Sequence, residues 1–198
     1  MSRGTISLMT NHSPLRVGFD MDGVLLYNPA RIIRPFMSYV KRLFLHKKTL
    51  SFYYPKSPHE KLFWSLAHKS SIYNAPGLSE IKELVSSGAI EAYLITARYG
   101  FLGKGVSQWV KKNDFEHTFK GVYFNSKDEQ PHLFKERMVD KLKLDMYVED
   151  NFDIVNHLKV TTSAEILWIY NILDGKTPFP RKFPHLKQAI QYIKSIKS

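Results

Sequence analysis

The stretch that decides the fold is Val17-Gly18-Phe19-Asp20-Met21-Asp22-Gly23-Val24, an apolar run that leads into Asp-x-Asp-Gly. Compact apolar runs bounded by polar residues or glycine are typical of strands that are covered on both faces. Asp-x-Asp-Gly strings also open calcium-binding loops. Here no third ligand follows at the required step, no Glu closes the loop, and a strand precedes the string. The stretch therefore predicts a buried strand whose end carries two carboxylates.

Four further runs have the same character, and helical patterns separate them. The predicted strands cover residues 16–20, 92–96, 121–125, 145–150 and 166–171. The predicted helices between and after them cover residues 78–87, 106–112, 132–143, 153–159 and 185–196. Strands that alternate with helices favour a parallel sheet with right-handed crossovers. The sequence therefore predicts an α/β fold with helices flanking a parallel sheet.

One connection is too long for a simple crossover. From Gly23 to Glu91 the chain runs 68 residues, whereas a crossover needs only about a dozen or more. A structureless loop of that length would be unusual in a compact domain. We therefore expect a small helical insertion over residues 28–74, with helices at 31–46 and 57–69. The core then comprises residues 15–27 and 75–198, and residues 1–14 are expected to form a flexible arm.

Composition excludes several classes of site. The chain has 198 residues, of which 43% are hydrophobic, so it can bury a sizeable core. It has no cysteine, which excludes disulfides, thiolate zinc sites and cysteine nucleophiles. No stretch has the apolar length of a membrane span, and the N-terminus lacks a signal-peptide pattern. We expect a cytoplasmic protein without membrane association, and the oligomeric state cannot be read from the sequence.

The net charge of +11 is concentrated in two segments. Residues 28–74 hold nine Lys or Arg and one acid, and residues 176–198 hold six Lys or Arg and no acid. Such segments attract phosphates, nucleic acid or acidic surfaces. A solvated basic surface that aids solubility accounts for the same charge. Nucleic-acid binding is therefore an alternative, but not the favoured one.

Polar residues gather where the predicted strands end. In open parallel sheets, ligands bind beyond the carboxyl ends of the strands. Those ends carry Asp20, Asp22, Thr96, Ala97, Arg98, Glu149, Asp150, Asn151 and, on the next helix, Asp153. Carboxylates brought together in this way repel one another unless a cation lies between them. Oxygen ligands without His or Cys indicate magnesium rather than zinc.

These segments resemble the motifs of the haloacid dehalogenase-like (HAD) phosphohydrolase superfamily. Residues 17–24 are similar to its first motif, Leu94-Ile95-Thr96-Ala97-Arg98 to its second, and Lys135 with residues 144–151 to its third and fourth. Order and spacing agree from Arg16 to Ile193. The amino-acid sequences of the second and fourth motifs are most similar to those of nucleotidase-like members, which have a helical cap after the first motif. The resemblance implies a Rossmann-like core, with the insertion as its cap.

The resemblance also implies a role for each residue of the phosphate site. Asp20 would be the nucleophile that takes the phosphoryl group. Asp22 would protonate the leaving oxygen and then deprotonate the attacking water. Thr96, Ala97 and Lys135 would hold the phosphoryl oxygens. Lys135 lies fifteen residues before Asp150, at the head of a predicted helix, and this spacing favours it over other lysines.

A magnesium ion is the implied cofactor. Its ligands would be the carboxylate of Asp20, the backbone carbonyl of Asp22, and Asp150. Glu149 would contact the metal ligands or reach the ion through a water molecule. Asp153 is a weaker candidate for the same role. A solvated lysine on the surface is the alternative for Lys135, and Lys127 would then take its role.

The implied function is magnesium-dependent hydrolysis of a small phosphomonoester through an aspartyl-phosphate intermediate, with a nucleotide as one candidate substrate. Arg98 and, in the insertion, Arg31 and Arg34 are candidates for substrate contact. Two alternatives stay open. A phosphotransferase or mutase would use the same core while protecting the intermediate from water. A binding protein for nucleic acid or an acidic partner would carry a vestigial site.

Overall fold

The computed structural model describes residues 13–27, 52, 54–55, 57–69 and 73–197. Its central sheet has six strands in the order β5-β4-β1-β6-β7-β8, and every neighbouring pair is parallel. The strands are β1 (Leu15–Phe19), β4 (Ile90–Tyr99), β5 (Phe119–Asn125), β6 (Met146–Glu149), β7 (Glu165–Ile169) and β8 (Lys182–Phe183). The five predicted strands and the parallel sheet are confirmed. β8 is an additional edge strand that the proline-rich composition around it concealed.

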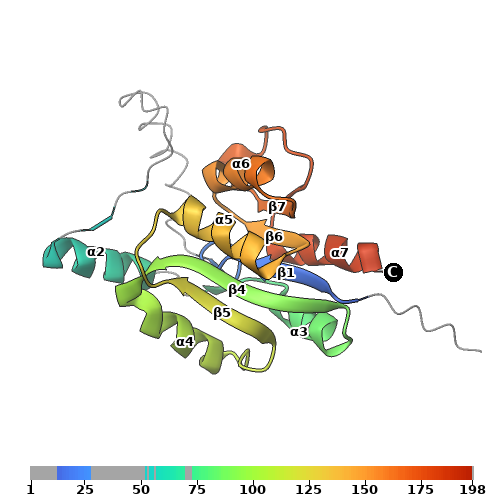
Figure 1. Ribbon diagram of the computed structural model, residues 1–198, viewed down its shortest axis with the longest axis horizontal. Coiled ribbons are helices and arrows are strands. Elements are labelled where there is room, and N and C mark those ends of the chain that lie inside the picture. Colours follow the sequence, from blue (N-terminus) through green and yellow to red (C-terminus); the bar gives the residue numbers. More distant parts are fainter. Residues whose placement is uncertain (1–12, 28–51, 53, 56, 70–72, 198) are drawn as a thin grey trace, which may run out of the picture.

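Five helices cover the sheet (Figure 1). They are α3 (Leu78–Ser86), α4 (Gly103–Lys112), α5 (Pro131–Leu142), α6 (Phe152–Thr161) and α7 (Leu186–Lys197). Short 3-10 helices, η2 (Gly100–Leu102) and η3 (Ile172–Asp174), follow β4 and β7. All five predicted helices are confirmed. Gly88, which follows the first of them, has a φ of +73° and donates its N–H to the carbonyl of Val85.

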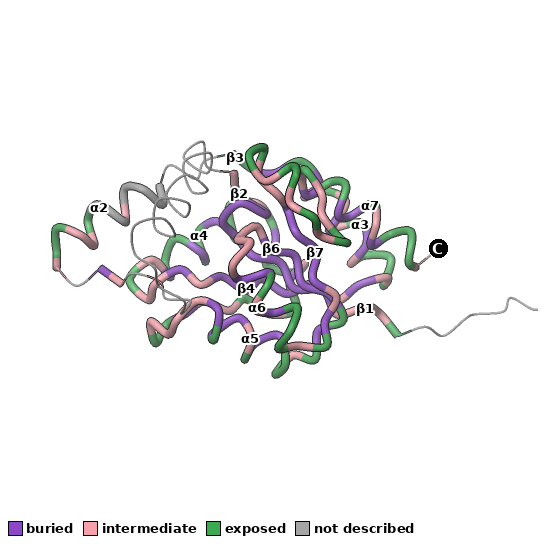
Figure 2. Tube along the Cα trace, turned by 90° about the horizontal axis from the view of Figure 1, so that it is seen from above, coloured by how far each residue is buried: buried purple, intermediate pink, exposed green. Residues whose placement is uncertain are grey.

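Each face of the sheet has its own hydrophobic core. Residues such as Leu94 of β4 and Val148 of β6 pack with α3, α4 and α7 on one face. Ile95 and Tyr147, the neighbours of these residues along the chain, pack with α5 and α6 on the other. In Figure 2 the strands form the buried centre of the molecule. Burial on both faces explains why the strands read as continuous apolar runs rather than alternating ones.

The order of the strands places a crevice at the end of β1. From β1 the sheet grows outward through β4 and β5, and the chain then returns to the other side of β1 to form β6, β7 and β8. Ligands in sheets of this kind bind at the carboxyl ends of the strands where the order reverses. The ends of β1 and β6 are therefore the expected position of a site.

The segment between β1 and α3 leaves and re-enters the core through paired strands. β2 (Leu26–Tyr27) pairs antiparallel with β3 (Tyr73–Asn74). Between them, α2 (Pro58–Lys69) confirms the helix predicted at 57–69. Its start is stabilised reciprocally, because the Ser57 N–H donates to Glu60 Oε2 over 2.9 Å and the Glu60 N–H donates to Ser57 Oγ over 3.2 Å. The predicted helix at 31–46 and residues 1–12 of the predicted arm lie outside the described residues. In the part of the chain that the structure describes, no helix could cross a bilayer.

Candidate active site

Asp20 lies directly after β1, at the crevice. Its N–H donates to the carbonyl of Val148 over 3.0 Å, which continues the pairing of β1 with β6 by one residue. Its side chain is buried, with 5% of the residue exposed. Burial is the main reason that the pKa of this carboxyl lies well above its usual range, and the neighbouring Glu149 and Asp150 raise it further against the opposing effect of Lys135. The position suits a carboxylate that needs a cation beside it.

Lys135 supplies one such cation. It projects from α5 and is 2% exposed. Its Nζ lies 3.1 Å from Asp20 Oδ1 and 2.6 Å from Glu149 Oε2. Burial alone lowers the pKa of Lys135, but the carboxylates of Asp20 and Glu149 outweigh that effect and raise it above its ordinary value. Lys127, the alternative, is exposed in the turn after β5. The structure therefore places Lys135, and not Lys127, beside Asp20.

Glu149 does more than the predicted supporting role suggests. The residue is fully buried at the end of β6. One carboxylate oxygen binds Lys135, and the other accepts the N–H groups of Asp150 and Asn151 over 3.2 and 3.0 Å. Asn151 in turn caps α6 by accepting the N–H of Asp153 over 3.0 Å. Glu149 thus fixes both the lysine and the turn that presents Asp150.

Asp20, Glu149 and Asp150 form a group that can hold a metal ion. One carboxylate oxygen from each lies within 4.8 Å of the others. Gly23 makes room for Asp150, because a Cβ at Gly23 would lie 2.2 Å from Asp150 Oδ2. These donors are carboxylate oxygens, which suit a hard cation such as Mg²⁺. Asp153 lies in the first turn of α6 and is not a member of this group within the described residues.

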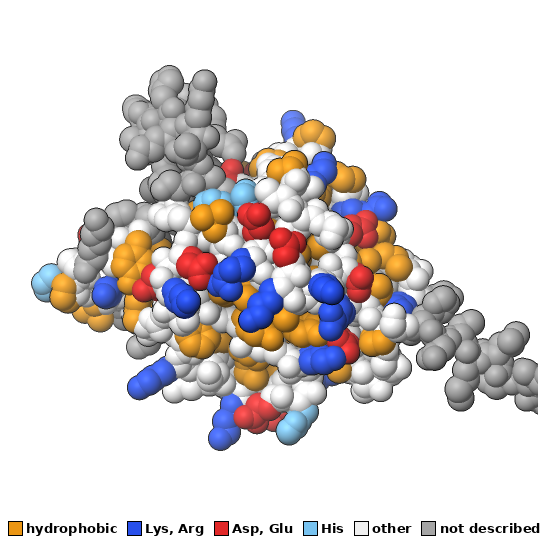
Figure 3. Space-filling view, viewed as in Figure 1, with side chains coloured by type: hydrophobic (Ala, Val, Ile, Leu, Met, Phe, Trp, Pro, Cys, Tyr) orange, Lys and Arg blue, Asp and Glu red, His pale blue; other side chains and the backbone are white. Residues whose placement is uncertain are grey.

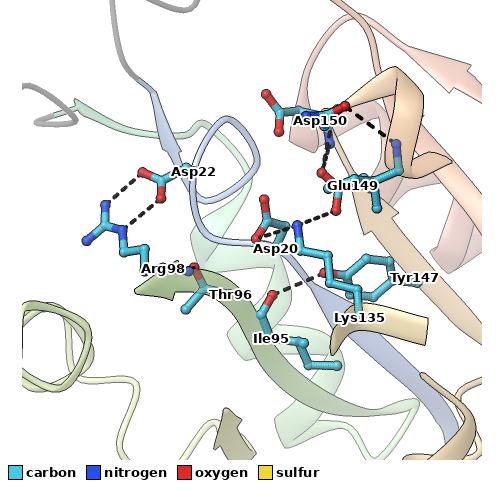
Figure 4. Close-up of polar contacts among 11 residues, drawn as sticks. Asp20, Asp22, Ile95, Thr96, Arg98, Lys135, Tyr147, Glu149 and Asp150 are labelled. Atoms are coloured by element: carbon cyan, nitrogen blue, oxygen red, sulfur yellow. Dashed lines mark hydrogen bonds and ion pairs between the residues drawn. The ribbon is translucent and has the colours of Figure 1, made fainter. Parts of the chain in front are cut away.

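Asp22 lies on the other side of Asp20 from Lys135 and Glu149 (Figure 4). Arg98 binds it with two parallel hydrogen bonds, from Nε to Oδ2 and from Nη2 to Oδ1, both 2.7 Å long. The arginine and aspartate side chains are only 8% and 12% exposed. Two-point pairing of this kind is the strongest form of a carboxylate–guanidinium contact. The side chain of Asp22 therefore faces Arg98, the residue that the sequence analysis named as a candidate for substrate contact.

The second predicted motif lies within a strand rather than beyond its end. β4 continues through Thr96, Ala97 and Arg98 to Tyr99, with an irregularity in its register between Thr96 and Tyr99. Thr96 is 1% exposed, and its Oγ1 accepts the N–H of Arg98 over 3.3 Å. Ala97 is half-buried. The irregularity turns Arg98 toward Asp22 while β4 stays paired with β5, and a strand that bulges could not be read from the residue pattern.

Solved structures share this architecture closely. A protein assigned as a beta-phosphoglucomutase from Thermotoga maritima is 16% identical, covers 92% of this chain and 99% of its own, and has a TM-score of 0.58. A HAD hydrolase of family IA, variant 3, from Entamoeba histolytica is 14% identical, with coverages of 91% and 99% and a TM-score of 0.57. The chain has the fold of the HAD-superfamily hydrolases. CbbY from Rhodobacter sphaeroides, solved with phosphate, is 10% identical, with coverages of 87% and 95% and a TM-score of 0.54. No family model and no curated protein matches the sequence.

One residue of the candidate site was missed by the sequence analysis. Tyr147 of β6 is fully buried behind Asp20 and donates its hydroxyl to the carbonyl of Ile95 over 3.1 Å, across β1. Gly18 makes this possible, because a Cβ there would lie 2.7 Å from Tyr147 Cδ2. Burial raises the pKa of Tyr147 well above its ordinary value, so the hydroxyl stays a donor. A tyrosine between the apolar residues Met146 and Val148 of β6 was the available signal.

Other predicted contacts are not tested by the described geometry. Arg31 and Arg34 lie outside the described residues. Two residues of the predicted insertion, Phe52 and Tyr54, contact the segment between β5 and α5. The backbone N–H of Phe52 donates to Gln130 Oε1 over 2.8 Å, and the Tyr54 hydroxyl donates to Asp128 Oδ2 over 2.7 Å. The segment between β5 and α5 is therefore fixed in part by residues that lie more than 70 positions earlier in the chain.

Proposed function

We propose that this protein is a magnesium-dependent phosphomonoester hydrolase that works through an aspartyl phosphate on Asp20. One observation carries the proposal. Asp20, Lys135, Glu149 and Asp150 lie together at the carboxyl ends of β1 and β6, where the order of the strands in the sheet reverses. A buried carboxylate that faces both a buried ammonium group and further acids is arranged to bind anions and a cation together. The HAD-like fold is consistent with the same chemistry.

Each residue has a defined task in the proposed reaction. An oxygen of Asp20 attacks phosphorus, and the bond from phosphorus to the leaving oxygen breaks. Asp22 gives its proton to that oxygen, and later accepts a proton from the water that attacks the aspartyl phosphate. Phosphate then leaves, and both carboxyl groups return to their starting states. Lys135 and Thr96 bind the phosphoryl oxygens on which negative charge accumulates, with the backbone at Ala97 beside them.

The proposed metal ligands are Asp20, the backbone carbonyl of Asp22, and Asp150. Bound Mg²⁺ would offset the charge of the phosphate and of the carboxylates around it. Glu149 holds Lys135 and the turn at Asp150, so that these two groups meet the nucleophile in fixed positions. Asp153 remains a more distant candidate.

We propose a small phosphorylated metabolite as the substrate, and a nucleotide as one candidate. Residues 28–74 would form a cap over a core of residues 15–27 and 75–198, and the cap's basic charge, with Arg31 and Arg34, suits an anionic substrate. CbbY, which shares the fold, is solved with phosphate. We propose a cytoplasmic location on the sequence pattern described above.

The test is a screen of nucleotides, sugar phosphates and other phosphomonoesters with Mg²⁺, run on the native protein and on Asp20→Asn. We expect turnover that needs Mg²⁺, is lost with a chelator, and falls by at least about a thousandfold in Asp20→Asn because the nucleophile is removed. Asp145→Asn is the matched control, since Asp145 accepts a backbone N–H at the opposite end of β6. Equal activity of native protein and Asp20→Asn would refute the proposal.

A further inference from the structure

The pairing of Asp22 with Arg98 conflicts with the task that the proposed function gives to Asp22. A general acid must carry its proton on an oxygen that faces the leaving group. Here both oxygens of Asp22 accept hydrogen bonds from Arg98, and each is 2.7 Å long. An oxygen that carries a proton cannot also keep its full contact with a guanidinium N–H. Arg98 must therefore release at least one oxygen before Asp22 can act.

Release is unfavourable unless another anion replaces Asp22. Both side chains are largely removed from water, with exposures of 8% for Arg98 and 12% for Asp22. A buried guanidinium that loses its carboxylate partner without a substitute is strongly destabilised. Water reaches this position poorly, so a second oxyanion is the natural replacement. Carboxylate and phosphate groups both match the planar donor pair of arginine.

The position of Arg98 shows which part of the substrate would supply that oxyanion. Lys135 and the carboxylates of Glu149 and Asp150 lie on one side of Asp20, and Asp22 with Arg98 lies on the other (Figure 4). The transferring phosphoryl group belongs beside Asp20 and Lys135. The leaving oxygen must reach Asp22, so the leaving group extends toward Arg98. A negative group on the leaving group would then meet the guanidinium.

The geometry points to a substrate whose leaving group carries a second oxyanion, a carboxylate or a phosphate, which takes Arg98 from Asp22. Asp22 then takes up a proton from solvent as the substrate binds and delivers that proton to the leaving oxygen. This inference rests on the proposed function and adds to it a substrate class. Arg98 is then the residue that distinguishes leaving groups that carry an anionic group from leaving groups that carry none. Lys135 has no part in the discrimination, because it faces the transferring phosphoryl group.

Matched substrate pairs test the inference. Phosphoglycolate is compared with its neutral amide, and ethylene glycol bisphosphate with 2-hydroxyethyl phosphate, each with Mg²⁺. We expect kcat/KM to be about tenfold or more higher for the charged member of at least one pair, as a buried charge-assisted contact provides. The pair with the larger ratio tells whether the second group is a carboxylate or a phosphate. In Arg98→Gln the ratio should fall to near one.

The ratio of kcat/KM for the charged substrate to kcat/KM for the neutral one distinguishes loss of substrate recognition from damage to the fold. A structural defect would lower kcat/KM for both members of a pair by the same factor. Arg98→Lys keeps the charge without the two-point donor, and should retain an intermediate ratio. Arg16→Gln is the matched control at the opposite end of β1, where Arg16 binds Glu91 and the carbonyl of Leu142. It should keep the native ratio.

Other outcomes decide against the inference. Equal use of both members of each pair by the native protein would overturn it, as would a preference that persists in Arg98→Gln. Turnover of p-nitrophenyl phosphate without turnover of either charged probe would also overturn it, and in all three cases the phosphohydrolase proposal would stand. Failure of the native protein to turn over any probe faster than Asp20→Asn would instead refute the proposed function itself.

Discussion

Lys135 forms ion pairs with two buried carboxylates at the centre of the candidate site. Its Nζ lies 3.1 Å from Asp20 and 2.6 Å from Glu149, and the lysine and Glu149 side chains are 3% and 0% exposed. Groups this far from water are stable as ions only while their partners are present. The contacts of Lys135 with Asp20 and Glu149 therefore contribute to the stability of the fold.

Replacing the lysine should expose this dependence. In Lys135→Met, Asp20 and Glu149 lose their cation, and we expect the free energy of unfolding in chelator to fall by about 3–5 kcal/mol. Urea denaturation measures the change. Adding Glu149→Gln to Lys135→Met should restore part of the loss, because one of the two buried charges is removed. Lys141→Met, at the exposed end of α5, should stay within about 0.5 kcal/mol of the native protein. Equal losses of unfolding free energy in Lys135→Met and Lys141→Met would show that the ion pairs of Lys135 do not stabilise the fold.

Gly23 is required for two separable reasons. Its φ of +86° disfavours any residue with a side chain, and a Cβ there would also meet Asp150. Gly88 provides a matched control, because its φ is +73° but nothing lies within 4 Å of its added Cβ. We expect Gly88→Ala to destabilise by about 1–2 kcal/mol through backbone strain alone. Gly23→Ala should cost more and should also weaken Mg²⁺ binding, as measured by calorimetry. Unchanged Mg²⁺ affinity in Gly23→Ala would show that Asp150 is not held by this contact.

At the scale of elements, α5 connects the site to the packing beneath it. Lys135 projects from the helix to Asp20, while His132, one turn earlier, packs against α6. The His132 ring lies 4.7 Å from that of His157 and 5.9 Å from that of Phe52. Within the described residues, Nδ1 of His132 is buried without a hydrogen-bond partner. Protonation would bring an unpaired charge into this contact.

The stability of the α5–α6 contact should therefore depend on pH. Burial lowers the pKa of His132, and His157 lowers it further against the opposing effect of Glu136. The unfolded chain then binds this proton more tightly than the folded chain does. Stability is greatest above the unfolded pKa of about 6.5 and decreases as pH falls through it. We expect the midpoint of urea unfolding to fall between pH 7.5 and pH 5.5, and to fall less in His132→Phe. If the urea midpoint changes with pH equally in the native protein and in His132→Phe, a group other than His132 causes the pH dependence.

At the scale of the whole molecule, the sheet and helices could be predicted because their causes are local. Strands buried on both faces are apolar throughout, and Gly88 and the Ser57–Glu60 cap end and begin helices through their own chemistry. Asp20 and Asp150 lie close together because they follow the neighbouring parallel strands β1 and β6, and α5 brings Lys135 to Asp20. β8 was missed because an edge strand of two residues leaves no periodic pattern. The pairing of Asp22 with Arg98 depends on a register irregularity that only the packing of β4 on β5 determines.

The distribution of charge also belongs to this scale. On the face shown in Figure 3, Lys and Arg side chains lie among Asp and Glu side chains rather than in a band of one sign. A face of mixed charge is unlike the continuous basic band that binds a nucleic-acid backbone. Tight, strongly salt-dependent binding to nucleic acid would favour the binding alternative instead.

Binding of Mg²⁺ should stabilise the whole fold, because the ion binds only where the three strand-end acids are assembled. We expect unfolding to be harder in excess Mg²⁺ than in chelator, by about 2.7 kcal/mol at a hundred times the dissociation constant. Thermal unfolding at fixed protein concentration measures the difference. Asp150→Asn should remove most of it, whereas Asp145→Asn, at the other end of β6, should not. An unfolding temperature that does not change with Mg²⁺ would argue against metal binding by Asp20, Glu149 and Asp150.

The pairing of β2 with β3 has a consequence for how such a protein can vary. Leu26 and Tyr27 lie opposite Asn74 and Tyr73, so the chain leaves and returns at neighbouring points. The segment between them can then be shortened, lengthened or exchanged for another without moving the catalytic strands, since the hairpin already holds its two ends together. A two-residue turn joining Tyr27 to Tyr73 would complete a minimal scaffold. The chain is in this sense modular, because the segment between β2 and β3 is joined through this strand pair to the sheet that carries Asp20 and Asp150.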